Sequence, residues 1–332
     1  MAKDSIVVLY TSLEVLIAVA CCLGNLLVIW AVWTCGGMRR QPTFRLIASL
    51  AAADFLVGAV ATPLRVLADS RVQMSFYGCL TLCCVVIFLT QVSVFSQLAL
   101  AFDRFLRVII PFRYKTTVTL HRCWWVVAAC WLMAATVGFT PLMGWNNHTS
   151  MSQSNRSECQ FLNVMSMSFL VYFSLYTCFL LPMLIMTIVY CCIFILIQRQ
   201  LRSTSTVVSH SYYHKERNLA RSLVLVLVLF AVCWLPIQLM NMATFYGTKF
   251  TVPRPALYVG ILLSQANSAI NPVLYALKIQ HIRAASKKIW RRFFRCKDEP
   301  QSSQTSGSDN SSNPRKTRDE KDTKSVETTR EG

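Results

Sequence analysis

The chain has 332 residues, of which 54% are hydrophobic and only 14% are charged. Soluble globular domains carry about 25% charged residues, so this composition argues against a soluble protein and for a membrane protein. Lysine and arginine number 33 against 15 acidic residues, but no module that mixes aromatic and basic residues for nucleic-acid binding is present, and we expect no nucleic-acid partner.

Seven apolar runs follow one another, each near or above the about 20 residues that a helix needs to span a membrane. They are residues 7–33, 43–66, 78–108, 122–144, 168–198, 218–246 and 254–277. The first run has no signal-peptide cleavage site, so we expect it to act as its own membrane anchor. The sequence therefore predicts an all-α membrane protein, a bundle of seven transmembrane helices over residues 7–277.

The two flanks of this bundle differ in composition. Residues 1–6 are predicted to be a short extracellular N-terminus, and 278–296 to be an amphipathic eighth helix at the membrane surface, with Lys and Arg opposite its apolar face. Cys296 ends that helix and is either a palmitoylation site or an ordinary free thiol. Residues 297–332 lack hydrophobic periodicity and predict a disordered cytoplasmic tail, whose phosphorylated Ser and Thr would bind arrestin.

Loop charge predicts the orientation of the spans. Basic residues gather in the loops after the first, third and fifth spans, which include Arg39, Arg40, Arg113, Lys115, Arg199 and Arg202. The positive-inside rule places these loops in the cytoplasm, the N-terminus outside and the C-terminus inside. The glycosylation sequons at Asn147 and Asn155 then lie in the second outer loop. We expect a multi-pass protein of the plasma membrane.

Most of the 14 cysteines lie inside apolar runs, where a thiol behaves as a small hydrophobic group. None has the spacing of a structural metal site. Cys79 and Cys159 differ, because both lie at the outer edges of predicted spans, where an oxidised pair can form.

Polar residues inside the spans are expensive and therefore candidates for function. Asp54 lies in the middle of the second span and needs a cation or hydrogen-bond donors. Residues expected at a similar depth are Asn25, Ser93, Asn267, Ser268 and Asn271. Oxygen ligands around one carboxylate suit a hard cation such as sodium, whereas a neutral polar network that specifies packing is the alternative.

At the cytoplasmic end of the third span, Asp103 and Arg104 are either interface anchors or part of a switch. Glu216 begins the sixth span at the same level and could pair with Arg104 in one state and release it in another. Pro236 and Pro272 interrupt the sixth and seventh spans. Their kinks could serve as hinges or simply reflect irregular packing.

One motif per span occurs in a fixed order: Gly24-Asn25, LAAAD ending at Asp54, Asp103-Arg104-Phe105, Trp131, Pro182, CWLP at 233–236 and NPVLY at 271–275. The set resembles the rhodopsin-like (class A) family of G-protein-coupled receptors, over about residues 7–295. The resemblance implies a Cys79–Cys159 disulfide and a sodium pocket of Asp54, Ser93, Asn267 and Asn271. It also implies a cytoplasmic lock of Asp103, Arg104 and Glu216, and an activation switch that includes Pro272, Tyr275 and Tyr190.

Within that family the chain looks like the adenosine receptors. The segments that carry this similarity are DRFLRV at 103–108, VGFTPLMGWNN at 137–147, CQFLNVMSMSFLVYFS at 159–174 and CWLPIQLMN at 233–241. Leu162, where other subtypes carry an acidic residue, is similar to the type-3 subtype. Val86 stands where amine receptors carry an aspartate, which argues against a monoamine ligand.

The resemblance implies a purine pocket. Phe161 would stack on the purine and Asn241 would hydrogen-bond its edge. The other implied residues are the apolar Ile237, Leu170, Ile261 and Trp234, the ribose-binding Thr90 and Ser264, and the pair of Glu14 and Gln265. From the residues alone, each also has a structural interpretation, such as a hydroxyl that bonds its own helix backbone.

Three positions depart from the adenosine-receptor pattern: Phe105, Gln238 and Gln265. Gln265 replaces a histidine that pairs with the acidic residue of the first helix, here Glu14, and an amide cannot become cationic. The expected function is a receptor for adenosine that lowers cyclic AMP through inhibitory G proteins, without a cofactor except an allosteric sodium ion. Alternatives are a receptor for inosine or another neutral ligand and, from another class, a transporter. No catalytic constellation predicts an enzyme.

Overall fold

The computed structural model describes residues 2–70, 72–148, 157–203, 207–247, 252–278 and 282–284. Within these ranges, the side chains of 2–4, 69, 157, 200–203, 207–223 and 278 lie outside the description. The chain divides into two units, Met1–Arg292 and Phe293–Gly332, and the described residues all belong to the first.

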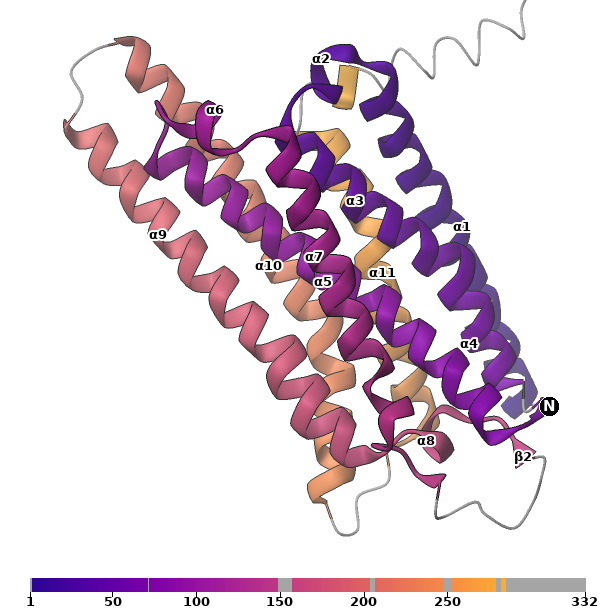
Figure 1. Cartoon of the computed structure of the whole chain (residues 1–332). Coiled ribbons are helices and arrows are strands. Elements are labelled where there is room, and N and C mark those ends of the chain that lie inside the picture. The colour runs from indigo at the N-terminus through magenta and orange to yellow at the C-terminus, as the bar shows by residue number, and fades with distance from the viewer. Residues whose placement is uncertain are drawn as a thin grey trace, which may run out of the picture. The chain divides into compact units, whose positions relative to one another are not determined.

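Within the described residues, seven long helical segments follow one another (Figure 1). They are built from α1 (Ala2–Thr34), α3 (Pro42–Leu56) with η1 (Val57–Ala61) and α4 (Thr62–Asp69), α5 (Phe76–Ile109), α7 (Leu120–Phe139) with η2 (Thr140–Met143), η4 (Phe169–Leu180) with α9 (Leu181–Ser203), α10 (Val207–Tyr246) and α11 (Arg254–Lys278). The short elements are α2 (Gly36–Arg39), α6 (Tyr114–Thr117), α8 (Phe161–Val164), β1 (Gln73–Met74) and β2 (Ser157–Glu158).

These segments confirm the all-α bundle that hydropathy predicts. Two helices extend beyond their apolar runs: α1 begins at Ala2 rather than at residue 7, and α10 begins at Val207 rather than at 218. Apolar composition marks the part of a helix that suits lipid, and a helix can continue through polar sequence on either side. Of the predicted eighth helix, the structure describes only residues 282–284, which are helical. The rest of 278–296 and the whole predicted tail lie outside the described residues, apart from the backbone of Lys278.

Six of the helical segments in the described part of the chain are long and apolar enough to cross a membrane: Ser5–Thr34, Pro42–Ala68, Phe76–Ile109, Leu120–Met143, Phe169–Arg199 and Val224–Tyr246. The predicted seventh span, α11, is long enough at 25 residues but is not among them. Its run of Ser264, Gln265, Asn267, Ser268 and Asn271 lowers its hydropathy, and all five side chains are buried. Neighbouring helices therefore cover the polar face of α11.

The long helices pack as a closed ring. Contacts run from α1 to α3, from α3 to α5, and on through α9, α10 and α11 back to α1, while α7 packs outside against α5 and α3. Two glycines permit the close approaches. A Cβ on Gly138 would lie 2.6 Å from the Cα of Phe88, and one on Gly24 would lie 3.1 Å from the ring of Pro272. Larger residues there would push α7 from α5 and α1 from α11.

Local chemistry explains where several of these helices begin and change pitch. Ser75 and Thr119 cap α5 and α7, since their side-chain oxygens accept from the backbone N–H of Gly78 at 3.2 Å and of Arg122 at 3.3 Å. The second segment widens into the π-helical turn η1, which ends where Thr62 Oγ1 donates to the carbonyl of Val57 at 3.1 Å. Such turns place an extra residue in the helix and rotate everything that follows, here including Arg65.

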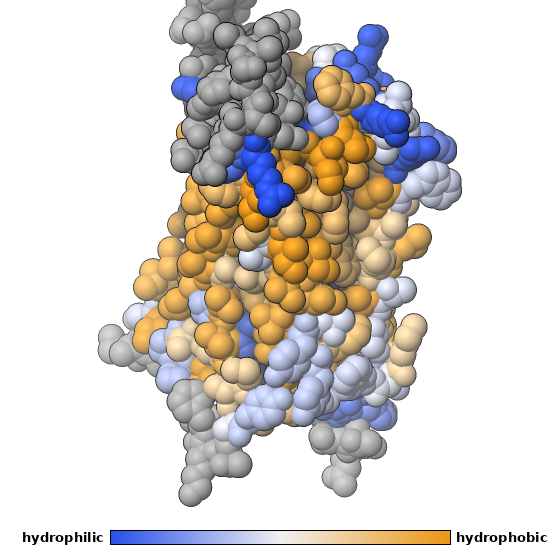
Figure 2. Space-filling view, turned by 90° about the vertical axis from the view of Figure 1, so that its left-hand side faces the viewer, coloured by the Kyte–Doolittle hydropathy of each residue, from blue (hydrophilic) through white to orange (hydrophobic). Residues whose placement is uncertain are grey.

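Apolar side chains cover the outside of the bundle. Exposed examples include Leu184, Ile188, Ile195, Val228 and Val232 on α9 and α10. Figure 2 shows a broad apolar belt between two more hydrophilic ends. Leaving so much apolar surface in water would cost about 25 cal/mol per Å², so the belt belongs in lipid and the protein is a multi-pass membrane protein.

Candidate functional site

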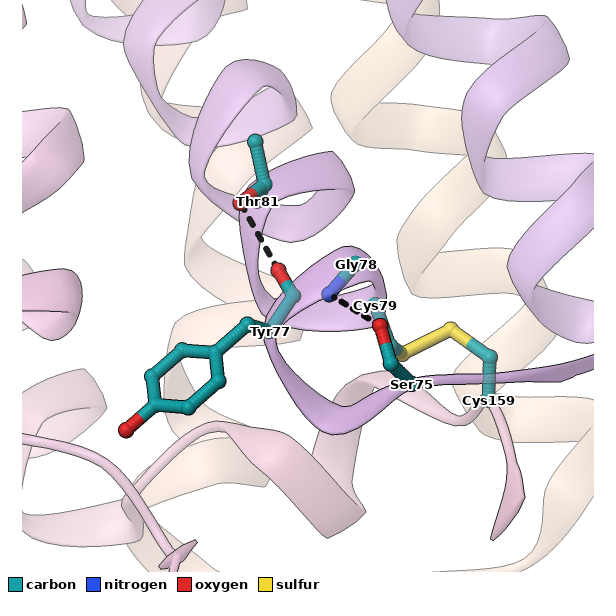
Figure 3. The surroundings of a disulfide bond; sticks show 6 residues. All are labelled: Ser75, Tyr77, Gly78, Cys79, Thr81 and Cys159. Carbon is teal, nitrogen blue, oxygen red and sulfur yellow. Dashed lines mark hydrogen bonds between the residues drawn. A yellow bond between two sulfur atoms is a disulfide. The ribbon is translucent and has the colours of Figure 1, made fainter. Parts of the chain in front are cut away.

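The predicted outer end of the bundle is tied together by a disulfide. Cys79, in the first turn of α5, bonds Cys159, which directly follows β2 (Figure 3). Strand β2 pairs antiparallel with β1, with Gln73 opposite Glu158. The predicted disulfide is thereby confirmed, and it holds the end of the second outer loop against α5.

Phe161 lies two residues after this disulfide, at the start of α8. It packs against an outer apolar cluster that also contains Leu170 of η4 and both bridged cysteines. The structure thus brings together two of the predicted purine-binding residues, Phe161 from the loop and Leu170 from the fifth segment. The disulfide fixes the start of α8, and the backbone N–H of Asn147 donates to the carbonyl of Val164 at 3.2 Å and fixes its end.

Two further helices, α10 and α11, supply four more of the predicted purine-pocket residues. Trp234, Ile237 and Asn241 are half-buried side chains of α10, and Ile261 is a half-buried side chain of α11. A Cβ on Gly260 would lie 3.5 Å from the Cα of Ile237, so α10 and α11 approach closely at this level. The indole Nε1 of Trp234 is buried without a hydrogen-bond partner in the described part of the chain.

The two predicted ribose-binding hydroxyls bond their own helices. Thr90 Oγ1 donates to the carbonyl of Val86 at 2.8 Å, and Ser264 Oγ donates to the carbonyl of Ile261 at 2.7 Å. This matches the structural interpretation of such residues. Each hydroxyl oxygen keeps two lone pairs, however, and can still accept from a ligand.

Glu14 lies on α1 and is completely buried. Gln265 Nε2 donates to Glu14 Oε1 at 2.6 Å, so the structure brings together the predicted pair. A third residue joins it: Arg65 Nε of α4 lies 3.6 Å from the same oxygen. Sequence reasoning missed Arg65 because it stands at the predicted end of a span, where a cation reads as an interface anchor. The available signal was its place in the apolar stretch TPLRVLA, at 62–68, since an ionisable residue within a span is a functional candidate by default.

Asp54 of α3 is the second fully buried carboxylate. Ser93 Oγ donates to its Oδ1 and Asn271 Nδ2 to its Oδ2, both at 2.8 Å. Asn267 is buried but makes no hydrogen bond to Asp54 within the described residues. Asn25 Nδ2 donates to the carbonyl of Ser268 at 3.1 Å.

The oxygens around Asp54 suit a hard cation. Asn25 Oδ1 is buried and has no hydrogen-bond partner among the residues that the structure describes. Carboxylate, hydroxyl and amide oxygens are the ligands that such cations prefer. The residues present therefore fit a sodium ion, and they also form a continuous polar network without one.

Asp103, near the C-terminal end of α5, is held by two side chains that sequence reasoning did not name. Thr43 Oγ1 of α3 donates to Oδ2 at 2.7 Å, and the hydroxyl of Tyr114 in α6 donates to Oδ1 at 2.6 Å. Burial, and then the nearby Asp103 charge, raise the pKa of Tyr114 above its usual value, which keeps its donated proton in place. Arg107 closes the cluster, with its terminal nitrogen 2.8 Å from Thr43 Oγ1. No local pattern links these partners, because they come from a helix start and a loop turn.

Arg104 follows Asp103 and is buried. Its predicted partner Glu216 lies in the helical backbone of α10, but its side chain is outside the described residues. Tyr190 of α9 and Tyr275 of α11 are buried and line a small cavity together with Met186, Leu100 and Gln97. Pro272 packs against Gly24. The predicted switch residues thus lie on four helices that meet in the half of the bundle predicted to face the cytoplasm.

The modification sites differ in what the structure describes. The side-chain amide of Asn147 is half-buried and donates to the carbonyl of Met165 at 2.9 Å. Asn155 and Cys296 lie outside the described residues. Glycosylation and palmitoylation stay predictions.

The family described as "7 transmembrane receptor (rhodopsin family)" matches residues 24–275 of the chain. The "Adenosine receptor A3" of Canis lupus familiaris is 39% identical over 294 residues, which cover 87% of this chain and 93% of the relative. The protein of the same name from Ovis aries is 38% identical, with 90% and 96% covered, and that from Bos taurus is 40% identical, with 83% and 87% covered. The resemblance stated from the motifs, including that to the type-3 subtype, is confirmed.

Proposed function

Because the chain belongs to the rhodopsin family of seven-transmembrane receptors, we propose that it is a plasma-membrane receptor for extracellular adenosine that acts through heterotrimeric G proteins. Members of this family are receptors and not enzymes. The observation that carries the proposal is the 38–40% identity to adenosine receptors A3 along most of both chains. The chemistry of the outer site supports the same ligand.

The proposed adenine subsite lies between the second outer loop and α10. Phe161 stacks on the purine face, and aromatic stacking of this kind contributes about 0.5–1.5 kcal/mol beyond burial. The amide of Asn241 offers a donor and an acceptor to the adenine edge, which presents the complementary pair. Leu170, Ile237 and Ile261 supply apolar walls.

The proposed ribose subsite lies on α5 and α11. Thr90 and Ser264 have each donated their hydroxyl proton to their own helix. Their oxygens therefore accept hydrogen bonds from the sugar, which is rich in donors. Trp234 lies two residues before Pro236 in α10. A ligand that contacts Trp234 therefore acts on α10, the helix that we propose moves on activation.

Signalling requires that adenosine bind the active state more tightly than the inactive one. In the proposed transition α10 swings outward about Pro236, Arg104 separates from Glu216, and Tyr190 and Tyr275 rearrange beside Pro272. A G protein then binds against Arg104 and the basic cytoplasmic ends of the helices. We propose the inhibitory class, which lowers cyclic AMP, from the similarity to type-3 receptors.

The proposed sodium site has Asp54 at its centre, with Ser93, Asn271 and Asn25 in support, since the Oδ1 of Asn25 has no hydrogen-bond partner among the described residues. Asn267 belongs to it only if its side chain turns. A bound cation would balance the buried carboxylate and favour the state that keeps these helices together.

The remaining proposals concern topology and modification. The charge of the loops supports an extracellular N-terminus and a cytoplasmic C-terminus. In that orientation Asn147 and Asn155 are accessible to glycosylation during synthesis, Cys296 is open to palmitoylation, and a phosphorylated tail at 297–332 binds arrestin.

A second candidate ligand is inosine, or a related neutral purine. The observation that favours it is Gln265, which replaces the histidine of the adenosine-receptor pattern and changes the sugar side of the site. Asn241 can serve either purine, because its amide can donate to the 6-oxo group of inosine as well as accept from the 6-amino group of adenosine.

Radioligand binding to membranes that contain the full chain tests the proposal. We expect saturable binding of a labelled adenosine analogue, lost in Asn241→Ala and kept in the control Leu239→Ala, whose side chain is exposed on the lipid face of α10. Absence of saturable binding to the wild type contradicts the proposal. A fall in cellular cyclic AMP with adenosine, inosine or both identifies the natural agonist and the G-protein class.

A further inference from the structure

Three helices meet at one carboxylate oxygen near the outer end of the bundle. Glu14 Oε1 of α1 accepts from Gln265 Nε2 of α11 at 2.6 Å, and Arg65 Nε of α4 lies 3.6 Å away. The side chain of Glu14 is 1% exposed and that of Arg65 is 19% exposed. Glu14 is thus buried, whereas the side chain of Arg65 is partly exposed at the surface of the protein.

Charge explains why Arg65 matters here. A buried carboxylate without a nearby cation tends to take up a proton, because burial penalises the charged form. Gln265 cannot supply the positive charge, since an amide does not ionise. The guanidinium of Arg65, 3.6 Å from Glu14 Oε1, supplies that positive charge and favours the charged form of Glu14.

An ionised Glu14 fixes the orientation of Gln265. A carboxylate oxygen can only accept, so the NH₂ of Gln265 must face it. Rotating the amide by 180° would place two acceptors 2.6 Å apart. The carbonyl oxygen Oε1 of Gln265 therefore points away from Glu14. Gln265 is 3% exposed, and Oε1 has no hydrogen-bond partner among the described residues.

A buried unpaired acceptor favours a ligand that donates to it, because a buried oxygen without a hydrogen bond has lost its water without a replacement. The preceding residue of α11 has the same preference. Ser264 has given its proton to the Ile261 carbonyl, which leaves its oxygen as an acceptor. This part of α11 thus offers two acceptors to a ligand hydroxyl. A ligand with an ether or a hydrogen atom at the same place would leave these acceptors without a donor.

We propose that Arg65 is a positioning residue for ligand recognition: through Glu14 it orients the amide of Gln265, whose Oε1 accepts from a hydroxyl of the ligand. The inference rests on the proposed function, in which that hydroxyl belongs to the sugar of adenosine. Arg65 itself does not touch the ligand. A purely structural pair that joins α1 to α4 would instead support every ligand equally.

The test measures affinity for adenosine, 2′-deoxyadenosine and 3′-deoxyadenosine in membranes with the full receptor. We expect Arg65→Leu to weaken adenosine binding about tenfold, the equivalent of one lost hydrogen bond to a buried acceptor. At least one deoxy analogue should change by less than about threefold, since it lacks the donor. Arg65→Lys should restore adenosine binding. A labelled antagonist without a sugar counts the folded sites in each variant.

Moving the cation gives a second readout. In Arg65→Leu/Gln265→His, the imidazole replaces the amide and carries the charge that balances Glu14. Pairing raises the imidazolium pKa above about 6.5, so this arrangement is present at low pH and lost as pH rises. Both nitrogens of the imidazolium are donors, so it offers no acceptor to the ligand hydroxyl, whereas the neutral imidazole can donate to Glu14 and accept from the ligand. We expect the double variant to bind adenosine more weakly at pH 6 than at pH 8, while Arg65→Lys, like the wild type, shows no such change.

The outcomes separate the two proposals. A wild type that binds no adenosine overturns the proposed function, and the sugar assignment with it. If the wild type binds but Arg65→Leu binds equally well, or loses all three ligands to the same extent, the inference alone is overturned. If Arg65→Leu lowers the number of folded sites, Arg65→Leu/Glu14→Gln replaces it, because that pair leaves no unpaired buried charge and no longer fixes the amide of Gln265.

Discussion

Glu14 and Asp54 are both completely buried carboxylates, but their surroundings differ in one respect. Glu14 has a guanidinium beside it, whereas the described residues place neutral donors, Ser93 and Asn271, on the two oxygens of Asp54. The charge of Glu14 is therefore balanced within the protein. The charge of Asp54 is stabilised only by hydrogen bonds from neutral groups of the protein, so a cation from solution can bind there. A carboxylate with its own cation serves to position its neighbours, and one without can serve as an ion site.

The largest expected effect comes from breaking the balanced pair. Glu14→Ala leaves Arg65 in the bundle without its partner and should lower the free energy of unfolding by about 3 kcal/mol, the lower end for such pairs because Arg65 is partly exposed. Thermal unfolding in detergent measures it. The double variant Glu14→Ala/Arg65→Leu should recover part of the loss, and an unchanged melting temperature in Glu14→Ala would contradict the pairing.

The second effect removes a donor from the unbalanced carboxylate. Ser93→Ala deletes the hydroxyl 2.8 Å from Asp54 Oδ1 and should cost about 2 kcal/mol, as for a hydrogen bond to a charged group. The matched control is Ser49→Ala, which removes the hydroxyl that accepts from the Trp131 indole at 3.1 Å and should cost about 1 kcal/mol. Equal melting temperatures of the two variants would argue that Asp54 is not ionised.

Sodium tests the comparison directly. If Asp54 takes the ion, sodium at ten times its Kd should stabilise the wild type by about 1.4 kcal/mol relative to choline at equal ionic strength. Asp54→Asn should abolish this difference, whereas Arg65→Leu should keep it. A sodium effect that survives in Asp54→Asn would place the ion elsewhere.

The smallest effect concerns a third carboxylate, Asp103, which resembles Asp54 in accepting from a neutral side chain on each of its two oxygens. Tyr114→Phe removes the donor at 2.6 Å but leaves Thr43 in place, and should lower the free energy of unfolding by about 1 kcal/mol. Because Asp103 adjoins Arg104, we also expect a rise in ligand-independent G-protein signalling. Basal cyclic AMP equal to that of the wild type would separate this cluster from the switch.

Much of the fold follows from composition, because each membrane span must be about 20 residues of apolar sequence. The limits of α11 were predicted to within one residue at its end. The first 11 residues of α10, from Val207, were not, since their sequence VVSHSYYHKER is too polar to count as a span. The π-helical η1 and η4 leave no mark in hydropathy, because an inserted residue changes the phase of a helix and not its composition.

Site residues that belong to a recognisable sequence pattern could be predicted. Residues whose role depends only on tertiary contacts were missed. Asp54 and Asn271 came from ordered motifs and Ser93 from its expected depth in the membrane, and the three meet as expected. Thr43 and Tyr114 have no such mark, although both bond Asp103. Arg65 could be noticed as a charge near the end of a span, but its partner on α1 is 51 positions away and only the packing of α1 against α4 reveals it.

The disulfide at the outer end also sets limits on motion. Phe161 follows Cys159 by two residues, and two residues span at most about 7 Å, so this ring must travel with the outer end of α5. Asn241 belongs to α10, which is free of that tether. A swing of α10 about Pro236 would then widen or narrow the distance between the two sides of a bound purine. We therefore expect the motion of α10 to control how long the ligand stays bound, while Phe161 and its loop stay fixed to α5.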